Sequence, residues 1–457
     1  MSNEKRIEEL EQKRKQINNV SCSFCTAKWL QTTLYLQNGY NHSCHHPSPH
    51  KIPISEIMGN PHALHNSKHK KKQREMMLKG ERPSECDYCW KIEDLDKNYF
   101  SDRHYKTADY WAWDRFDEIA QSNPQDNMYP SYLEVSFSNA CNFACAYCSP
   151  EISSKWMEDI KQNGQYPVVH GSHNLDYLKK TQKFPYLNSE VNPYVKAFWK
   201  WFPDALPHLK VLRLTGGEPT MSKETWRLLD MLIENPMPDL EVAINTNLCV
   251  PSNLIDKLIE KINDLKGKVK KIDVYTSLES TNEQAEYARD GLDYKQWINN
   301  MHQVLQQTES TVAIMTTVNI LSLPTFTNFI DLVMDFRKQY NKAFEYNRVP
   351  ISINYLRWPP HLQCTLLDKE DRELYANAIE KLCESWLKYH SPDKYARLYL
   401  EEWDQIKRFC DYLRNTDPAI EHRNDFVAYI QAYDKRRRKN FRKVFEDYRN
   451  IIEDWNA

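Results

Sequence analysis

The stretch "NACNFACAYCSP", residues 139–150, places Cys141, Cys145 and Cys148 within eight residues of one another. It directly follows "YLEVSFS" (132–138), an apolar and β-branched run of the kind that forms a buried strand. Three thiolates at this CxxxCxxC spacing can hold three corners of a [4Fe–4S] cluster, whereas a cluster held by protein alone takes four cysteines. A metal site that lacks one protein ligand leaves a position open for a substrate or cofactor. The alternative is a zinc knuckle, since spacing alone does not identify the metal.

Five further strand-like runs follow, with helical patterns between them. They are "KVLRLT" (210–215), "LEVAINT" (240–246), "KIDVYTSL" (271–278), "TVAIMTTVNI" (311–320) and "PISINYL" (350–356). Helical periodicity fills 222–235, 252–265 and 326–340. Strands that alternate with helices in this way predict βαβ units and a parallel sheet. We expect an α/β fold with a partial (β/α)6 TIM-like barrel, although a flat doubly wound sheet fits the same periodicity.

The second strand ends in "LRLTGGEPT", residues 212–220, which contains two of the chain's nine glycines side by side. Adjacent glycines let the backbone approach a ligand closely and adopt positive φ. Glu218 behind them offers a carboxylate to a cationic amine. By itself this turn could also be a tight loop without a ligand.

Together the two motifs resemble those of the radical S-adenosylmethionine (radical SAM) superfamily. That family has CxxxCxxC after its first strand, with an aromatic residue before the last cysteine, and a GGEP motif after its second strand. The residues that carry the resemblance are Cys141, Cys145, Tyr147, Cys148, Gly216, Gly217, Glu218 and Pro219.

The resemblance implies that the three cysteines hold a [4Fe–4S] cluster and that SAM binds its fourth iron. Reductive cleavage of SAM would give a 5′-deoxyadenosyl radical that takes a hydrogen atom from the substrate. An electron donor such as flavodoxin or ferredoxin would then be a partner.

The resemblance extends to the ends of the later strands. "INTN" (244–247) ends the third strand, and "YTSLES" (275–280) has Glu279 and Ser280 where the family usually has Asp-Gly. Each further position can equally be an ordinary polar or core residue of the barrel. The SAM contacts implied here are Asn245, Asn247, Ser277, Arg289, Asn319 and Leu356.

A second group of cysteines lies before the barrel, in a region with little regular periodicity. Within it "WLQTTLYLQNGYNHSC" predicts a hairpin that turns at Asn38-Gly39. The region resembles the auxiliary-cluster module called twitch or SPASM, which implies a second, auxiliary [4Fe–4S] cluster. The ligands carried over are Cys25, Cys44, Cys86 and Cys89, with His45 where that branch often has a further cysteine. The alternative is zinc held by Cys22, Cys25, Cys86 and Cys89.

The overall composition indicates which partners and which cellular location to expect. The formal net charge is −2, from 61 Lys and Arg against 63 Asp and Glu, which argues against a nucleic-acid coat or an anionic membrane surface as partner. The basic runs "SKHKKKQR" (67–74) and "KRRRKNFRK" (435–443) are expected to be solvated helix faces. No long apolar run is present and the N-terminus is charged, so we expect a cytoplasmic protein.

We expect four regions along the chain: a charged helix (1–20), the auxiliary-cluster module (21–129), the barrel (130–360) and a helical C-terminal region (361–457). The family resemblance covers about residues 22–360. The first functional hypothesis is a radical SAM enzyme that acts on a peptide or protein side chain. The second is a radical SAM dehydrogenase or epimerase of a small metabolite, and the third is a non-enzymatic zinc protein that binds nucleic acid. No residue is marked out by spacing as a catalytic acid, base or hydrogen donor.

Overall fold

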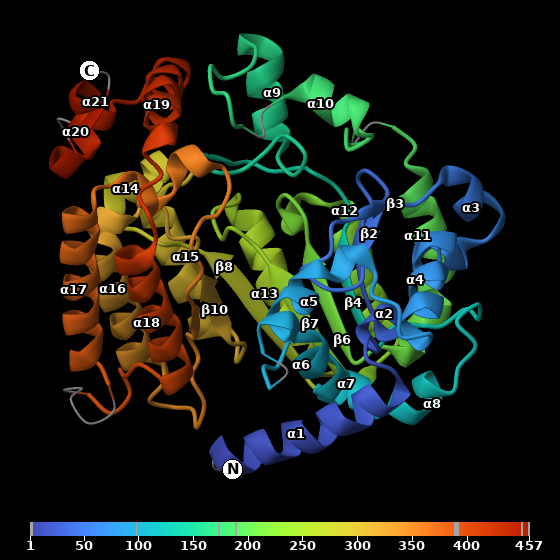
Figure 1. The fold of residues 1–457 in the computed structure, drawn as a ribbon. Helices are drawn as coiled ribbons and strands as arrows, with labels where there is room; N and C mark the ends of the chain where they lie inside the picture. The colour runs from blue at the N-terminus through green and yellow to red at the C-terminus, as the bar shows by residue number, and fades with distance from the viewer. Residues whose placement is uncertain are drawn as a thin grey trace.

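One sheet connects most of the molecule in the computed structural model (Figure 1), which describes residues 3–96, 98–171, 174–187, 190–387, 393–448 and 451–455. Its nine strands run in the order β11-β10-β8-β7-β6-β4-β1-β2-β3. In Figure 1 the sheet occupies the centre, the N-terminal elements lie on its right, and the helices α17 and α18 lie on its left. The bounds of those two helices are Lys369–Ser385 and Leu400–Asn415.

The six predicted strands form the barrel part of this sheet. They are β4 (Tyr132–Ser136), β6 (Val211–Thr215), β7 (Met237–Asn245), β8 (Val269–Ser277), β10 (Val312–Met315) and β11 (Ile351–Ser352). Each pairs in parallel with the next, which confirms the α/β class and the partial barrel. The last two are shorter than predicted, and a single bridge between Val318 and Tyr355 continues their pairing beyond the strand ends.

Helices with one apolar face cover this sheet. In α12 the buried side chains include Leu228, Leu229 and Leu232, and Ser222 caps the helix by accepting a hydrogen bond from the backbone N–H of Glu224. The helices between the first strand and the last are α9 (Ser154–Asn163), α10 (Leu175–Lys180), α11 (Pro193–Ala205), α12 (Lys223–Glu234), α13 (Ser252–Leu265), α14 (Asn282–Ala288), α15 (Tyr294–Gln307) and α16 (Phe326–Tyr340).

The N-terminal region extends the barrel sheet. The predicted hairpin is present: β1 (Gln31–Tyr35) and β2 (Tyr40–His42) pair antiparallel, and Gly39 has φ +70° in the turn. β1 also pairs in parallel with β4, from Gln31 opposite Tyr132 to Tyr35 opposite Ser136. A hairpin pattern predicts the turn and the pairing of its own two strands. It does not predict which other strand pairs with the hairpin, so the pairing of β1 with β4 was not predicted. The other elements of the region are α1 (Asn3–Val20), α2 (Ala27–Leu30), β3 (His50–Lys51), α3 (Ile54–Gly59), α4 (Lys68–Leu78), α5 (Asp87–Leu95), α6 (Asp102–Ala108), α7 (Tyr110–Trp113) and α8 (Phe116–Ala120).

The C-terminal region is helical and packs against the barrel at two places. On α18, Glu402 accepts two hydrogen bonds from Arg337 of α16, at 2.9 and 2.5 Å, and both side chains are buried. On α19 (Arg423–Arg437), the Tyr429 hydroxyl donates to the carbonyl of Ala146 at 2.7 Å, within the cysteine loop. The last helices are α20 (Phe441–Val444) and α21 (Ile451–Asp454). Among the described residues, no helix combines the length and apolar character needed to cross a membrane.

Candidate metal and cofactor site

The loop after β4 carries the three clustered cysteines to the carboxyl ends of the neighbouring strands. There they line a cavity of about 260 Å³. In βα barrels this is the end at which active sites form. The lining residues are Cys141, Phe143, Cys145, Tyr147, Cys148, Ile152, Thr215, Gly216, Gly217, Pro219, Asn245, Thr246, Asn247, Ser277 and Arg289.

Burial keeps these three sulfurs protonated unless a metal binds them. It raises the pKa of Cys141 to about 12, with a further contribution from the nearby Cys145. It also raises the pKa values of Cys145 and Cys148, despite the Arg289 guanidinium close to Cys145. A metal that takes thiolate ligands must displace these protons, so the site suits a soft, strongly bound metal centre.

The paired glycines hold the cysteine loop against the second strand end. The backbone N–H of Gly217 donates to the carbonyl of Ser138 at 3.3 Å, and that of Glu218 donates to the carbonyl of Ala140 at 2.7 Å. A Cβ at Gly217 would lie 2.4 Å from the Ala140 carbonyl oxygen, and Gly216 has φ +132°. The two backbones can therefore approach this closely only because position 217 has no side chain.

The Glu218 side chain does not line the cavity, which departs from the expectation that its carboxylate receives a cationic amine. One carboxylate oxygen accepts from the backbone and hydroxyl of Thr220 at 3.1 and 2.7 Å, and the other accepts from the backbone N–H of Asn247 at 2.7 Å. Glu218 is 1% exposed, and this burial raises its pKa. Its observed contacts join the ends of β6 and β7.

Arg289 lines the cavity but already has a carboxylate partner. It lies on β9 (Arg289–Asp290), which pairs antiparallel with β5 (Ala144–Cys145), so that Arg289 stands opposite Cys145. Its Nε and Nη2 donate to the two carboxylate oxygens of Glu279, at 3.1 and 2.5 Å. The Tyr147 hydroxyl donates to the same carboxylate at 3.0 Å. Glu279 thus orders the ring and the guanidinium beside the cysteines, a role that sequence reasoning missed.

The other predicted contacts divide into two groups. Asn245, Asn247 and Ser277 lie on the cavity. Asn319 and Leu356 do not line it: the Asn319 side chain bonds the Thr317 carbonyl and the Leu321 backbone N–H, and Leu356 is buried in the core. Sequence reasoning missed the lining residues Phe143, Ile152, Thr215 and Thr246. Thr215 and Thr246 end the second and third predicted strands, and their position at a strand end could have identified them as cavity residues.

Residues 135–333 match the family model described as the radical SAM superfamily. The chain carries a radical SAM domain. Among curated proteins, it is similar to the GTP 3′,8-cyclase of Pasteurella multocida (30% identity over 116 residues, 25% of this chain and 26% of the relative). It is also similar to the GTP 3′,8-cyclase of Aliarcobacter butzleri (25% identity over 133 residues, 29% and 31%). The chain thus spans less than a third of the length of these relatives.

Outside the radical SAM domain, four cysteines line a second, small cavity. Cys25 precedes α2, Cys44 follows β2, and Cys86 and Cys89 lie at the start of α5. Cys22 is not among the lining residues: it is exposed, and its thiol donates to the Gly80 carbonyl at 3.3 Å. The structure therefore brings together the set of four cysteines that includes Cys44.

Two cationic side chains lie against this second cysteine cavity. Lys28 is 2% exposed and pairs with Glu85, and Arg103 pairs with Glu93 at 2.7 Å. Burial raises the pKa values of Cys44 and Cys89 to about 12. As in the radical SAM domain, these sulfurs are thiols in the absence of a metal.

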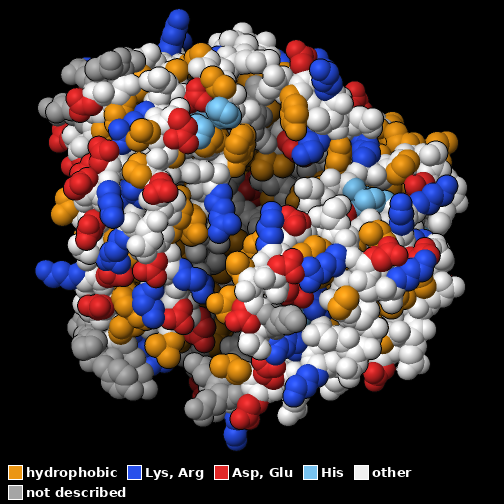
Figure 2. Space-filling model, viewed as in Figure 1, with side chains coloured by type: hydrophobic (Ala, Val, Ile, Leu, Met, Phe, Trp, Pro, Cys, Tyr) orange, Lys and Arg blue, Asp and Glu red, His pale blue; other side chains and the backbone are white. Residues whose placement is uncertain are grey.

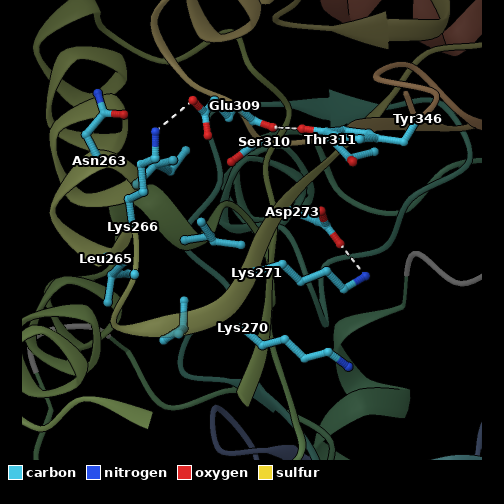
Figure 3. Close-up of a pocket in the computed structure, with 14 residues that line it drawn as sticks. Asn263, Leu265, Lys266, Lys270, Lys271, Asp273, Glu309, Ser310, Thr311 and Tyr346 are labelled. Carbon is cyan, nitrogen blue, oxygen red and sulfur yellow. Dashed lines mark hydrogen bonds and ion pairs between the residues drawn. The ribbon is translucent and has the colours of Figure 1, made fainter. Parts of the chain in front are cut away.

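The opposite end of the barrel contains a cavity of about 470 Å³ near the amino ends of β8 and β10 (Figure 3). Its charged side chains neutralise one another: Lys266 pairs with Glu309 at 2.7 Å and Lys271 with Asp273 at 2.9 Å (Figure 3). Lys270 pairs with Glu241 at 2.7 Å. These matched charges give no sign of an ionic ligand.

Proposed function

We propose that the protein is a radical SAM enzyme in which Cys141, Cys145 and Cys148 hold a [4Fe–4S] cluster and SAM occupies the adjoining cavity. The observation that carries the proposal is the cavity itself, which joins three thiols to the glycine turn and to the polar ends of three strands. When bound, the cluster and SAM supply radical hydrogen-atom abstraction. The three thiols leave one iron for the cofactor, so the donor set fits the group.

The residues of this chain prepare the cavity for that chemistry. Asn245, Asn247 and Ser277 present polar groups to the cofactor side, while Phe143 and Ile152 give the cavity apolar walls. Apolar walls limit the access of water to a reactive species. A flavodoxin or ferredoxin would supply the electron.

We infer a second, auxiliary [4Fe–4S] cluster at Cys25, Cys44, Cys86 and Cys89. Tetrahedral zinc with Zn–S bonds of about 2.3 Å holds its sulfurs only about 3.8 Å apart. Among the described residues, some sets of three or more possible metal-ligand atoms lie within 4.8 Å of one another. None of these sets contains a sulfur of these four cysteines. No three of these four sulfurs therefore lie within 4.8 Å of one another, a wider arrangement than tetrahedral zinc holds, which supports a larger metal cluster. Lys28 and Arg103 would offset part of the negative charge of four thiolates.

For the substrate, the inner face of the sheet offers a polar surface that leads away from the cysteine loop. Because side chains alternate along a strand, Glu134 and Arg213 lie on the same face as Thr215, which lines the cavity. The Thr215 hydroxyl donates to Glu134 at 3.2 Å, and the Arg213 guanidinium lies 4.4 Å from the centroid of the Tyr275 ring. The face of the molecule seen in Figure 2 is hollowed near its centre, between the N-terminal elements and the C-terminal helices.

The polar surface also extends toward the second cysteine site. The exposed His45 imidazole lies within reach of the charges of Glu134 and Arg213. His45 directly follows Cys44, so a substrate on this surface would lie between the two cysteine sites. An auxiliary cluster there could bind the substrate or accept an electron from it.

We propose a peptide or protein side chain as the substrate. A cavity of about 610 Å³ adjoins the cysteine loop and shares Tyr147, Cys148 and Ile152 with the smaller one. Exposed apolar side chains stand along it: Val169 (82% exposed), Tyr177 (57%) and Trp358 (54%). An open, partly apolar cavity of this size accommodates an extended chain better than an enclosed pocket does. Similarity to GTP 3′,8-cyclases favours a second candidate, a nucleotide such as GTP.

Three measurements test these proposals. Anaerobically reconstituted protein should contain about eight irons with matching sulfide, as two four-iron clusters require. With dithionite and SAM it should release 5′-deoxyadenosine, and the Cys141→Ala/Cys145→Ala/Cys148→Ala variant should release none. A wild-type protein that holds its iron and still yields no 5′-deoxyadenosine under verified reduction contradicts the radical mechanism. Transfer of deuterium into 5′-deoxyadenosine from labelled peptides or from labelled GTP separates the two substrate classes.

A further inference from the structure

Two segments far apart in the sequence, the loop after α9 and the start of α19, meet beside the 610 Å³ cavity, which His170 lines. His170 follows α9, His422 ends a short helix (Ile420–His422), and Asp425 lies in the first turn of α19. The ligand atoms of these three residues all lie within 4.8 Å of one another. α9 and α19 are neighbours at the top of Figure 1, and Arg436 of α19 donates to the carbonyls of Gly164 and Gln165 at 2.8 Å.

The Asp425 carboxylate is held in place without being neutralised by a lysine or arginine. One of its oxygens accepts from the backbone N–H of Val169 at 2.9 Å, and the other from that of His170 at 3.1 Å. Within the described part of the chain, its ion-pair partner is the imidazole of His170, with Nδ1 at 3.6 Å. Each carboxylate oxygen keeps a lone pair after one hydrogen bond. A carboxylate oriented by backbone hydrogen bonds is typical of a metal ligand with an ordered outer shell.

The two imidazoles complete a set of ligands. The rings of His170 and His422 lie 5.1 Å apart with an interplanar angle of 78°. The Nδ1 atom of His422 is buried and has no hydrogen-bond partner. Behind them the Nδ1 atom of the buried His361 lies 3.1 Å from the His170 carbonyl, which fixes the backbone at that position. A buried imidazole nitrogen without a partner is costly unless something binds it.

A second group of this kind differs at its carboxylate, although His50 Nδ1 is likewise buried without a hydrogen-bond partner. His50, His69 and Glu85 also place their ligand atoms within 4.8 Å of one another. There the Glu85 carboxylate is paired with the buried ammonium of Lys28, and His50 Nε2 lies 3.3 Å from the Ser67 hydroxyl. A fixed cation next to the carboxylate opposes the binding of a divalent ion. The group at His50 therefore serves as an internal comparison.

We propose that His170, His422 and Asp425 form a site for a divalent transition-metal ion such as Zn²⁺. Two imidazoles and one carboxylate leave coordination positions open, as in metal sites that bind a substrate or water. His170 also lines the 610 Å³ cavity, so the ion would lie at its rim and could bind an oxygen atom of a molecule there. The ion would also cross-link the loop after α9 to the C-terminal helices. The proposal stands on these side chains alone and does not rest on the radical SAM chemistry.

The test measures zinc in the full-length protein with its iron–sulfur clusters in place. Wild type, His170→Ala, His422→Gln, Asp425→Asn and His69→Ala are incubated with Zn²⁺, desalted, and analysed for zinc and iron. We expect about one zinc more per chain in the wild type and in His69→Ala than in the other three variants, at equal iron. All variants keep the same cysteines, so adventitious thiol-bound zinc cancels in the comparison.

The Tm of thermal unfolding is a second measurement, and a variant that misfolds would show a lowered Tm even without zinc. Zn²⁺ should raise the Tm of the wild type and leave that of His170→Ala unchanged. His170 is 52% exposed, so its replacement should hardly alter the Tm in the absence of zinc. Equal zinc content in the wild type and His170→Ala, or loss of zinc from His69→Ala alone, would overturn the proposal.

Discussion

Arg289 and Glu279 form a two-point ion pair beneath the cysteine loop, with N–O distances of 3.1 and 2.5 Å. Glu279 is 0% exposed and Arg289 is 5% exposed. The same arginine stands opposite Cys145 on the two-stranded ladder β5–β9. The geometry of the first cysteine site therefore depends on the charge of a residue that does not line the cavity.

Removing that charge should destabilise the protein and the site together. Glu279→Gln leaves a buried guanidinium without its counter-ion, and breaking a buried pair in this way costs about 3–5 kcal/mol. We expect a lower denaturation midpoint and poorer iron retention after reconstitution. The matched control is Glu309→Gln, because the Lys266–Glu309 pair has exposed side chains (65% and 62%) and should contribute under about 1 kcal/mol. Equal effects of the two substitutions would contradict this account.

The close approach of two backbones at Gly217 gives a second prediction. In Gly217→Ala the new Cβ would meet the carbonyl oxygens of Ala140 and Asn139 at 2.4 and 2.8 Å. The cysteine loop must shift, so we expect loss of the iron bound by that loop, measured by iron content and by the visible absorbance of the cluster. Gly59→Ala is the control, since a Cβ there meets nothing within 4 Å. Full iron content in Gly217→Ala would show that the loop tolerates the displacement.

The two candidate ligand sets in the N-terminal region predict different iron contents. Cys44→Ser should lower the iron content by about four per chain, because Cys44 lines the second cavity. Cys22→Ser should retain the full content, because this exposed thiol only donates to Gly80. Zinc bound by the wild type and lost from Cys22→Ser would instead support the CxxC pairs as ligands.

The buried imidazole of His104 should make the stability of the fold depend on pH. It is 2% exposed, and burial, together with the nearby Arg103, lowers its pKa from 6.5 to about 3. Between these values the unfolded chain binds a proton that the folded chain does not, so stability falls as the pH drops below 6.5. Between about pH 3 and pH 6.5, protonation of His104 in the unfolded chain lowers the free energy of unfolding by about 1.4 kcal/mol for each unit of pH.

The substitution that isolates this proton is His104→Gln. In the wild type, the backbone N–H of Ser101 donates to His104 Nδ1 at 3.0 Å in a capping box at the start of α6, a position where glutamine is common. Denaturant titrations at pH 7 and pH 5 should show a smaller acid loss of stability in His104→Gln. An identical loss would mean that other groups cause it.

The local patterns predicted the strands and helices of the barrel because the periodicity of each element lies in its own residues. "LEVAINT" and "SNLIDKLIEKINDL" have periods that only a strand and a helix satisfy. The parallel pairing of β1 with β4 was not predictable in this way, since it joins Gln31 to Tyr132 across a hundred residues. The pairing of Arg289 with Glu279 was also not predicted, because it depends on how the chain folds across the helix α14 between them.

Two predicted site residues, Glu218 and Asn319, have their observed hydrogen bonds in nearby turns and do not line the cavity. Glu218 follows the paired glycines as the family pattern requires, yet its carboxylate accepts hydrogen bonds from Thr220 and Asn247. Asn319 likewise shapes a turn after β10. A polar side chain near a strand end has several backbone groups within reach, and sequence does not show which one it will choose.

The pairing of β1 with β4 also determines what happens if the N-terminal region is removed. Without β1, the strand that leads into Cys141 would become an open sheet edge with unpaired N–H and carbonyl groups. Such edges recruit strands from other chains. A truncated barrel would therefore tend to aggregate, and the spacing between the two cysteine sites is fixed by the same ladder of backbone hydrogen bonds that protects that edge.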